Sequence, residues 1–325
     1  MSKEEITNAI NEVLGKEYGF EIYVGMKYGD QRMKRFILEE GKPHEKNGFK
    51  KRIKNEIAGV IVEKYLSEGS QYADLDEIAN EQKRFLIIPQ SVEYCPFEFL
   101  NTPEEEMENF KLTDKNEAEA IWFKFTIQRD GKIKILWAYQ KILPASIPNK
   151  KEKNFQLIVK SKEQPDVFRE MPEQMFVITQ KIDLLVVENN IVTDEITLME
   201  RHFGLEELIR KSAKEAAREI TAVGLAANHE KLYEYVKRPN KKYAKKMMQI
   251  HKYPVASMSK EKLLRKIRTV NRWKNVFEIK NGLIQLRNYT DVENMIDLFT
   301  ERYTKSEVTG QEYDTTVKDK AKPVE

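Results

Sequence analysis

The chain has 325 residues, of which 40% are hydrophobic and 34% charged, and its formal net charge is +3. This length fits two folded units, and the apolar share is large enough for packed cores, which excludes a globally disordered chain. No window approaches the roughly 20 apolar residues of a membrane span, and the first residues lack the apolar run of a secretory signal, so we expect a soluble, intracellular protein. A single cysteine, Cys95, and four scattered histidines exclude internal disulfides and offer no zinc-ligand spacing.

Helical and strand patterns alternate in the first part of the chain. Helices are predicted over residues 2–15, where Ser2 and Glu5 match a capping box, and over residues 49–66. Strand patterns occupy residues 20–24, 35–38, 85–88, 122–128, 133–140, 155–159, 175–179, 184–188 and 191–198. Tight turns are predicted at Asp130-Gly131 and at Asn189-Asn190. The short connections favour an antiparallel, meander-like sheet with flanking helices over parallel βαβ units.

Beyond Gly204 the pattern becomes mainly helical. One apolar stripe runs through residues 205–223, and further helices are predicted at residues 230–236, 241–250, 259–272 and 290–303. A hairpin over residues 276–286 is centred on Asn281-Gly282. We therefore predict an α+β fold with three parts. They are an α+β assembly domain (residues 1–203), a mainly helical basic domain with a β-hairpin (residues 204–313) and a flexible tail (residues 314–325).

Charge is distributed unevenly along the chain. Residues 61–120 contain fifteen Asp and Glu against five Lys and Arg, whereas residues 231–274 contain fifteen Lys and Arg against only Glu234 and Glu261. Such a separation can bind a polyanion at the basic end and place the acidic part against a basic partner or against the protein's own basic part. The alternative interpretation is that both stretches form ordinary solvated helical faces.

The basic stretch predicts a nucleic-acid surface. Within residues 259–272, Leu263, Leu264, Ile267 and Val270 form one apolar helix face, which leaves cations on the other faces. The candidate DNA-binding residues are Lys237, Arg238, Lys241, Lys242, Lys245, Lys246, Lys262, Arg265, Lys266, Arg268 and Arg272. Short helices followed by a basic hairpin are typical of a winged-helix module. Because phosphate contact requires only clustered cations, we expect binding with little sequence preference.

Enzymatic signatures are sparse. The sequence has no phosphate-binding G-x-x-x-x-G-K-[ST] loop, no G-x-G-x-x-G, no H-E-x-x-H and no G-x-S-x-G. No histidine is expected near Cys95, which is interpreted as a packing residue and not as a nucleophile. We assign no catalytic residue, no metal ligand and no cofactor, and we expect a protein that is not an enzyme.

A Mg²⁺-dependent nuclease is the alternative function. Such a site needs a carboxylate followed by Glu-x-Lys on a neighbouring strand, and Asp30 with Glu40 and Lys42 has this order. The tripeptide Glu278-Ile279-Lys280 lies on a better strand, but no aspartate precedes it nearby. Glu-x-Lys arises by chance several times in so charged a chain.

Several runs of the sequence together resemble a known family. They are Ile88-Pro89-Gln90-Ser91 with Tyr94, Pro96-Phe97-Glu98-Phe99-Leu100, the strand patterns of residues 176–199 leading into His202-Phe203-Gly204-Leu205-Glu206-Glu207-Leu208-Ile209, and Ser306-Glu307-Val308-Thr309-Gly310-Gln311-Glu312-Tyr313. Over residues 86–313 the chain resembles the KwaB-like family of the Kiwa anti-phage defence system, whereas the first 80 residues match only in general layout.

The resemblance implies a cytoplasmic bacterial defence protein that binds DNA and works with a small transmembrane partner, KwaA, which holds it at the inner membrane. It supplies no catalytic residues. The acidic stretch would suit contact with positively charged cytoplasmic loops of such a partner. We also expect a homodimer, because symmetric dimers are the commonest soluble assembly.

Overall fold

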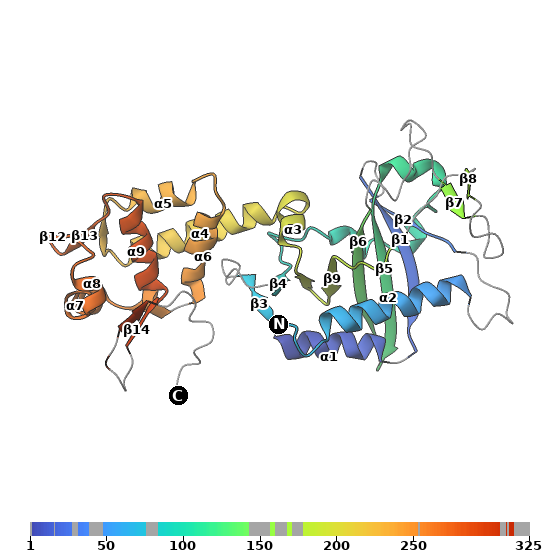
Figure 1. The fold of residues 1–325 in the computed structure, drawn as a ribbon, viewed down its shortest axis with the longest axis horizontal. Coiled ribbons are helices and arrows are strands. Elements are labelled where there is room, and N and C mark those ends of the chain that lie inside the picture. Colours follow the sequence, from blue (N-terminus) through green and yellow to red (C-terminus); the bar gives the residue numbers. More distant parts are fainter. Residues whose placement is uncertain are drawn as a thin grey trace. The chain divides into compact units, whose positions relative to one another are not determined.

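Two compact units make up the chain. A computed structural model describes residues 2–15, 17–27, 32–38, 48–75, 84–142, 157–159, 168–170, 178–252, 254–305, 310 and 312–314. Unit 1 comprises Met1–Tyr72 and Arg84–Glu195, and unit 2 comprises Ala73–Lys83 and Ile196–Glu325. Figure 1 labels most of their helices and strands.

The main sheet has eight strands in the order β2-β1-β5-β6-β9-β10-β4-β3, and all of them lie in unit 1 except β3, which starts at the last residue of that unit's first segment. Their bounds are β1 (Gly19–Met26), β2 (Met33–Arg35), β3 (Tyr72–Asp74), β4 (Phe85–Pro89), β5 (Ala118–Arg129), β6 (Lys132–Lys141), β9 (Leu184–Val187) and β10 (Asn190–Thr193). Neighbours from β2 to β4 all run antiparallel, and β5, β6, β9 and β10 follow one another as a meander. Strands β7 (Leu157–Val159) and β8 (Phe168–Glu170) form a separate pair. The predicted antiparallel, meander-like sheet is confirmed.

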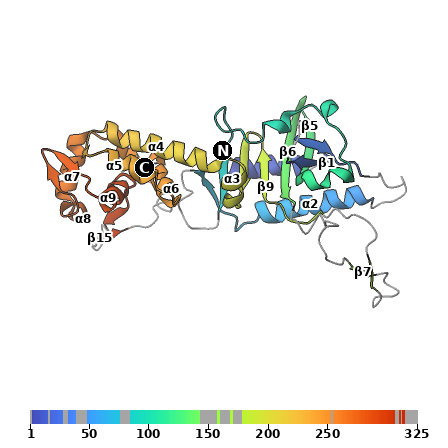
Figure 2. The same cartoon turned by 90° about the horizontal axis from the view of Figure 1, so that it is seen from above.

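Helix α2 (Phe49–Tyr65) lies along one face of this sheet (Figure 2), and helix α1 (Lys3–Leu14) packs against β5, β6 and β9. The predicted capping box is present, because the Ser2 hydroxyl accepts from the Glu5 amide while the Glu5 carboxylate accepts from the Ser2 amide. The helices and strands bury a common core that includes Ile6, Ile10, Val13, Ile53, Ile57, Ile61, Phe123, Phe125 and Leu136. Removal of this apolar surface from water is the main stabilising contribution to the unit.

The opposite face of the sheet carries an aromatic cluster. Trp122 meets Tyr139 and Phe97 in edge-to-face contacts, with ring centroids 4.9 and 5.1 Å apart. Short 3₁₀ helices, Glu98–Asn101, Glu104–Glu106 and Leu112–Glu117, belong to the segment between β4 and β5 that carries Phe97. Both faces of β5 are therefore buried, because side chains alternate along a strand and each face has its own cover.

Turns and strand ends follow local chemistry. Asp130 and Gly131 have φ values of 50° and 74°, as a type I′ hairpin turn requires. The next turn lies at Glu188-Asn189, one residue earlier than predicted, with φ 52° at Glu188. The predicted strand over residues 191–198 is wrong beyond Thr193. The Thr193 hydroxyl accepts a hydrogen bond from the Glu195 amide at 2.9 Å, and this local contact ends the strand pairing. Most of the strand predicted at residues 175–179 lies outside the described residues, and residues 178 and 179 are not in a strand.

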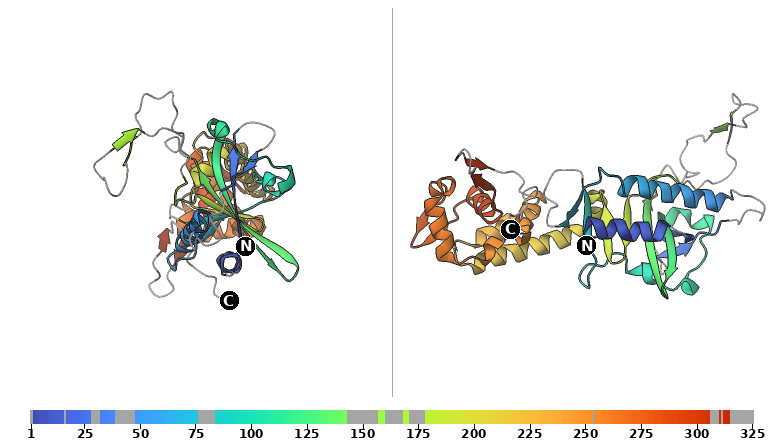
Figure 3. Two further views of the ribbon diagram at one scale, coloured as in Figure 1. Left: turned by 90° about the vertical axis from the view of Figure 1, so that its right-hand side faces the viewer. Right: turned by 90° about the horizontal axis from the view of Figure 1, so that it is seen from below.

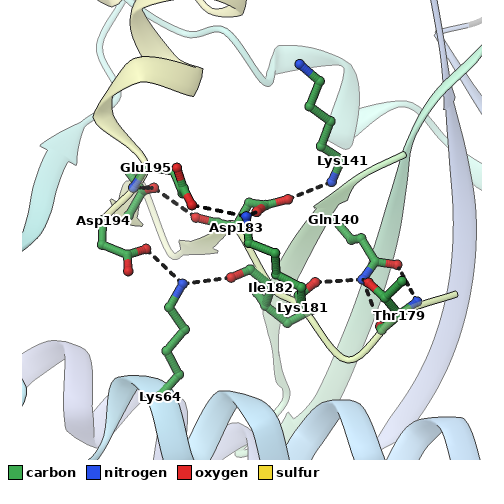
Figure 4. Close-up of polar contacts among 10 residues, drawn as sticks. Lys64, Gln140, Lys141, Thr179, Lys181, Ile182, Asp183, Asp194 and Glu195 are labelled. Carbon is green, nitrogen blue, oxygen red and sulfur yellow. Dashed lines mark hydrogen bonds and ion pairs between the residues drawn. The ribbon is translucent and has the colours of Figure 1, made fainter. Parts of the chain in front are cut away.

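A polar clasp closes the sheet where the chain returns to it at residues 178–183 (Figure 4). The Gln140 amide donates to the carbonyl oxygens of Thr179 and Lys181, both at 2.7 Å. Asp183, only 4% exposed, accepts from the Lys141 amide at 2.7 Å and pairs with the Lys181 ammonium at 2.7 Å. These five residues, which we call the clasp, satisfy one another's polar groups, as buried polar side chains require.

Unit 2 is mainly helical. Its helices are α3 (Ile196–His202), α4 (Leu205–Ala222), α5 (Glu230–Val236), α6 (Lys242–Met248), α7 (Lys260–Thr269), α8 (Asn271–Lys274) and α9 (Tyr289–Phe299). Its strands are β11 (Ala226–Ala227), β12 (Ile279–Lys280) and β13 (Leu283–Gln285) in the order β11-β13-β12, and a separate pair, β14 (Tyr303–Lys305) with β15 (Glu312–Asp314). The predicted hairpin is present, with φ 50° at Asn281 and 69° at Gly282.

Three local predictions need correction. The helix predicted over residues 259–272 breaks at Val270 (φ −87°, ψ 121°) into α7 and α8. The last helix is capped by Asn288, whose side chain accepts from the Asp291 amide at 3.0 Å, and not at Thr290. Cys95 is exposed instead of packed in the core. None of the described helices has the length and apolar composition needed to cross a membrane.

Candidate nucleic-acid interface

Helix α7 has an apolar side and a cationic side. Ser259 caps it by accepting from the Lys262 amide at 3.4 Å, and Leu263 and Ile267 are buried. The exposed cations, which we call the α7 basic face, are Lys262, Arg265, Lys266 and Arg268. None of these four forms an ion pair with a residue that the structure describes. Lys262, Arg265 and Lys266 lie three and four positions apart, so they project from one side of the helix.

The break at Val270 places two further basic residues on the short helix α8. The guanidinium of Arg272 lies over the Trp273 ring, 4.9 Å from its centroid. Trp273 is 4% exposed and stacks on Phe277 at 5.8 Å, which fixes α8 against the start of the hairpin. Lys274 is exposed. The region from α7 to the hairpin therefore offers cations on a rigid apolar base.

The lysines of α6 and its N-terminus are mostly engaged inside unit 2. Glu200, whose side chain is 8% exposed, pairs with Lys241 at 3.1 Å and with Lys245 at 2.6 Å. Lys241 also pairs with Glu206 at 2.9 Å, and its hydrogen bond to that carboxylate raises the pKa of Lys241. Lys246 pairs with an aspartate of α9 at 3.2 Å. Three of the predicted site residues thus hold helices together, a role that their spacing in the sequence did not reveal.

Lys237, Arg238 and Lys242 surround the turn between α5 and α6. Lys237 and Lys242 are exposed and have no ion pair within the described part of the chain. Arg238 is stacked between two aromatic rings, 3.7 Å from the centroid of Tyr243 and 4.6 Å from that of Tyr289. The sequence indicated tyrosines among these cations but could not show that Tyr289, from α9, completes the stack.

Arg210 of α4 holds the turn between α5 and α6 in place through hydrogen bonds to its backbone. Its guanidinium donates to the carbonyl oxygens of Val236 and Arg238, at 3.2 and 3.3 Å, and it pairs with Glu206 at 3.0 Å. Cations near the C-terminus of a helix stabilise its unpaired carbonyl groups. Arg210 therefore positions the turn, and no pattern in the sequence identified it.

The carboxylate of the hairpin, Glu278, is neutralised by neighbouring cations and does not form an acidic site. Glu278 pairs with Lys280 at 2.6 Å and with Arg287 at 3.0 Å, and its bond from Lys280 lowers the pKa of Glu278. Arg287 also pairs with Asp291 at 3.2 Å. Among the described residues no group of acidic, histidine or cysteine side chains could hold a metal ion. The candidate nuclease residues Asp30, Glu40 and Lys42 lie outside the described residues.

Part of the acidic stretch is neutralised within unit 1. Asp114 pairs with Lys34 at 3.0 Å, and this hydrogen bond lowers the pKa of Asp114. Glu104 pairs with Lys124. Glu63 and Glu68, by contrast, are exposed and have no ion pair with any residue whose placement is described. The acidic stretch is thus partly internal and partly a solvent-facing surface.

Replacing Glu200 with Gln should destabilise unit 2, because it leaves Lys241 and Lys245 without their shared carboxylate. We expect the free energy of unfolding to fall by about 1–3 kcal/mol, since Glu200 is nearly buried and both partners are charged. Differential scanning calorimetry would measure the loss. The matched control is Glu207→Gln on α4, where the glutamate is exposed and has no ion pair with a described residue. An equal effect of both substitutions would contradict the assigned role of Glu200.

Comparison with known proteins agrees with the resemblance found in the sequence. The model of the family described as Kiwa protein KwaB-like matches residues 115–309. This range includes β5, β6, β9 and β10 of unit 1 and every helix of unit 2 described above. Neither the curated proteins nor the solved structures gave a match. Because the family model covers more than half of the sequence, the chain belongs to the Kiwa protein KwaB-like family.

Proposed function

We propose that this protein acts in anti-phage defence by binding DNA through the α7 basic face. The observation that carries the proposal is that these four exposed cations have no ion pair with a described residue, whereas Lys241, Lys245 and Lys246 do. Cations without protein partners can neutralise phosphates and release the counterions condensed on DNA. Membership of the KwaB-like family supports the antiviral role.

The proposal adds contacts from two further places in unit 2. Arg272 on α8 and the turn residues Lys237, Arg238 and Lys242 would touch the same polyanion or its flanks. Arg238 is held by aromatic rings and so loses little freedom when it binds a phosphate. The contacts would be with phosphates and not with base edges, so the proposed binding has little sequence preference.

The proposal also includes a place and partners for the protein. It is a cytoplasmic homodimer held at the inner membrane by the transmembrane protein KwaA. The support is the family membership, which implies partnership within a Kiwa system in general terms. The exposed part of the acidic stretch would face basic loops of that partner.

Fluorescence anisotropy of a labelled DNA duplex across a salt series tests DNA binding directly. If the α7 basic face contacts four phosphates, log affinity should fall with log salt at a slope of about −3.6, and more steeply if the turn between α5 and α6 takes part. Addition of Mg²⁺ should leave the DNA intact. A duplex that does not bind at low salt, or a flat salt dependence, would refute the proposal. Cleavage with Mg²⁺ would favour the nuclease instead.

A further inference from the structure

Strand β6 has an edge that β9 leaves uncovered. The β6–β9 ladder ends at the pair Leu136–Val187, whereas β6 begins four residues earlier, at Lys132. The tip of the β5–β6 hairpin therefore extends beyond β9 (Figure 3). Natural sheets normally cover or charge such edges, because an uncovered edge invites another strand.

The register shows which backbone groups are available there. In a two-residue hairpin the flanking residues, Arg129 and Lys132, form a hydrogen-bonded pair, and such pairs alternate along the ladder. Lys134 consequently bonds to β5, while the amides of Ile133 and Ile135 point to the side on which β9 is missing. Neither amide has an acceptor among the described residues. The side chains of Ile133 and Ile135 are 67% and 37% exposed, which is unusual for isoleucine in a strand.

A groove runs along this edge. Its volume is about 390 Å³, within the range of ligand pockets, and it is lined by every residue from Lys132 to Ile135. Consecutive residues of a strand point to opposite faces, so a cavity that touches all of them follows the edge and not one face. Helix α1 contributes Ala9 and Val13 to one wall, and the segment around Leu100 forms the other.

The end of the groove is fixed before anything binds. The turn after β9 contributes Asn189, whose side chain donates to the Gln90 carbonyl at 2.8 Å, and the Gln90 amide donates back to the Asn189 carbonyl at 2.9 Å. Both residues line the groove. A site whose walls are already in place loses little conformational entropy on binding.

We propose that this groove binds an extended peptide segment of a partner protein as an added strand on β6. Only an extended backbone offers acceptors at the spacing of the Ile133 and Ile135 amides, and alternate apolar side chains would cover the two isoleucines. Lys132, the first residue of β6, is exposed and has no ion pair with a described residue. It favours an acidic residue in the peptide, next to the residues that pair with β6. The site lies in unit 1 and is independent of the proposed DNA-binding surface.

The test uses the full chain and a displayed library of random twelve-residue peptides. Selection should enrich sequences with alternating apolar residues and an acid near one end. A selected synthetic peptide should slow hydrogen exchange at the amides of Ile133 and Ile135 at least tenfold, as measured by NMR, and leave Lys134 unchanged, because that amide is already bonded to β5.

Two variants distinguish peptide binding in the groove from non-specific hydrophobic binding. Ile135→Pro removes the outward amide without removing a bond to β5, so it should weaken peptide binding at least tenfold and leave DNA binding unchanged. Ile37→Asp alters an isoleucine that is also 67% exposed but lies outside the groove, and it should have no effect. The proposal fails if no peptide is enriched or if Ile135→Pro binds the selected peptide normally. It also fails if both amides become protected with rising protein concentration alone, since a second copy would then be the occupant.

Discussion

Reversal of the α7 basic face to glutamate should lower the affinity for duplex DNA on the order of 100- to 1,000-fold at moderate salt. The variant replaces Lys262, Arg265, Lys266 and Arg268, so it removes up to four phosphate contacts and adds four repulsive charges. The slope of log affinity against log salt should become shallower by about 3–4. Because these side chains are exposed and have no ion pair with a described residue, the fold should be unaffected, which circular dichroism would verify.

The matched control changes the net charge equally at other exposed cations. It reverses Lys51 and Arg52 on α2 together with Lys214 and Arg218 on α4. If DNA contacts the α7 basic face itself, this control should reduce the affinity for DNA less than about tenfold, because it changes only the long-range electrostatic field of the protein. Equal losses in the two variants would show that net charge, and not the α7 basic face, accounts for binding.

Asp183→Ala should be the most destabilising single substitution in the clasp. It removes the acceptor of the Lys141 amide and the partner of the Lys181 ammonium at a position that is 4% exposed. We expect the free energy of unfolding of unit 1 to fall by about 2–4 kcal/mol, because a buried amide loses its partner and an ion pair is broken. Urea denaturation followed by far-ultraviolet circular dichroism would measure it.

Two substitutions show whether the loss comes from the buried contacts. Asp183→Asn keeps an oxygen for the Lys141 amide and should recover about half of the stability. Glu195→Ala removes only the outer partner of Lys181. Because the Glu195 side chain is 40% exposed, the free energy of unfolding should fall by less than about 1 kcal/mol. If Glu195→Ala proved as harmful as Asp183→Ala, surface charge would explain the effect better than the clasp does.

Sequence patterns located most elements because the patterns are local. The hairpin at Asp130-Gly131 and the capping box at Ser2 depend on residues within a few positions, and the structure has both. The order of the strands in the sheet, by contrast, depends on contacts between residues far apart in the sequence. Strand β1 pairs with β5, and β10 with β4, across long stretches of sequence, so no local pattern could reveal these neighbours.

The candidate site shows the same division. Amphipathic spacing correctly indicated the buried Leu263 and Ile267, and with them the exposed side of α7. Spacing could not distinguish Lys245 from Lys266, because the partner of Lys245 is Glu200, which lies far away in the sequence. Composition counts charges, whereas the number of cations left without a protein partner depends on tertiary ion pairs.

The clasp also has a consequence for how the protein tolerates changes in length. It ties the end of β6 to the residue before β9, so the two ends of the connection between these strands, Ile142 and Ile182, lie at adjacent points of the sheet. The entropy of closing such an excursion grows only with the logarithm of its length, so halving or doubling it changes stability by about 0.6 kcal/mol. A longer, shorter or exchanged connection ahead of Thr179 should therefore leave the eight-stranded sheet in register.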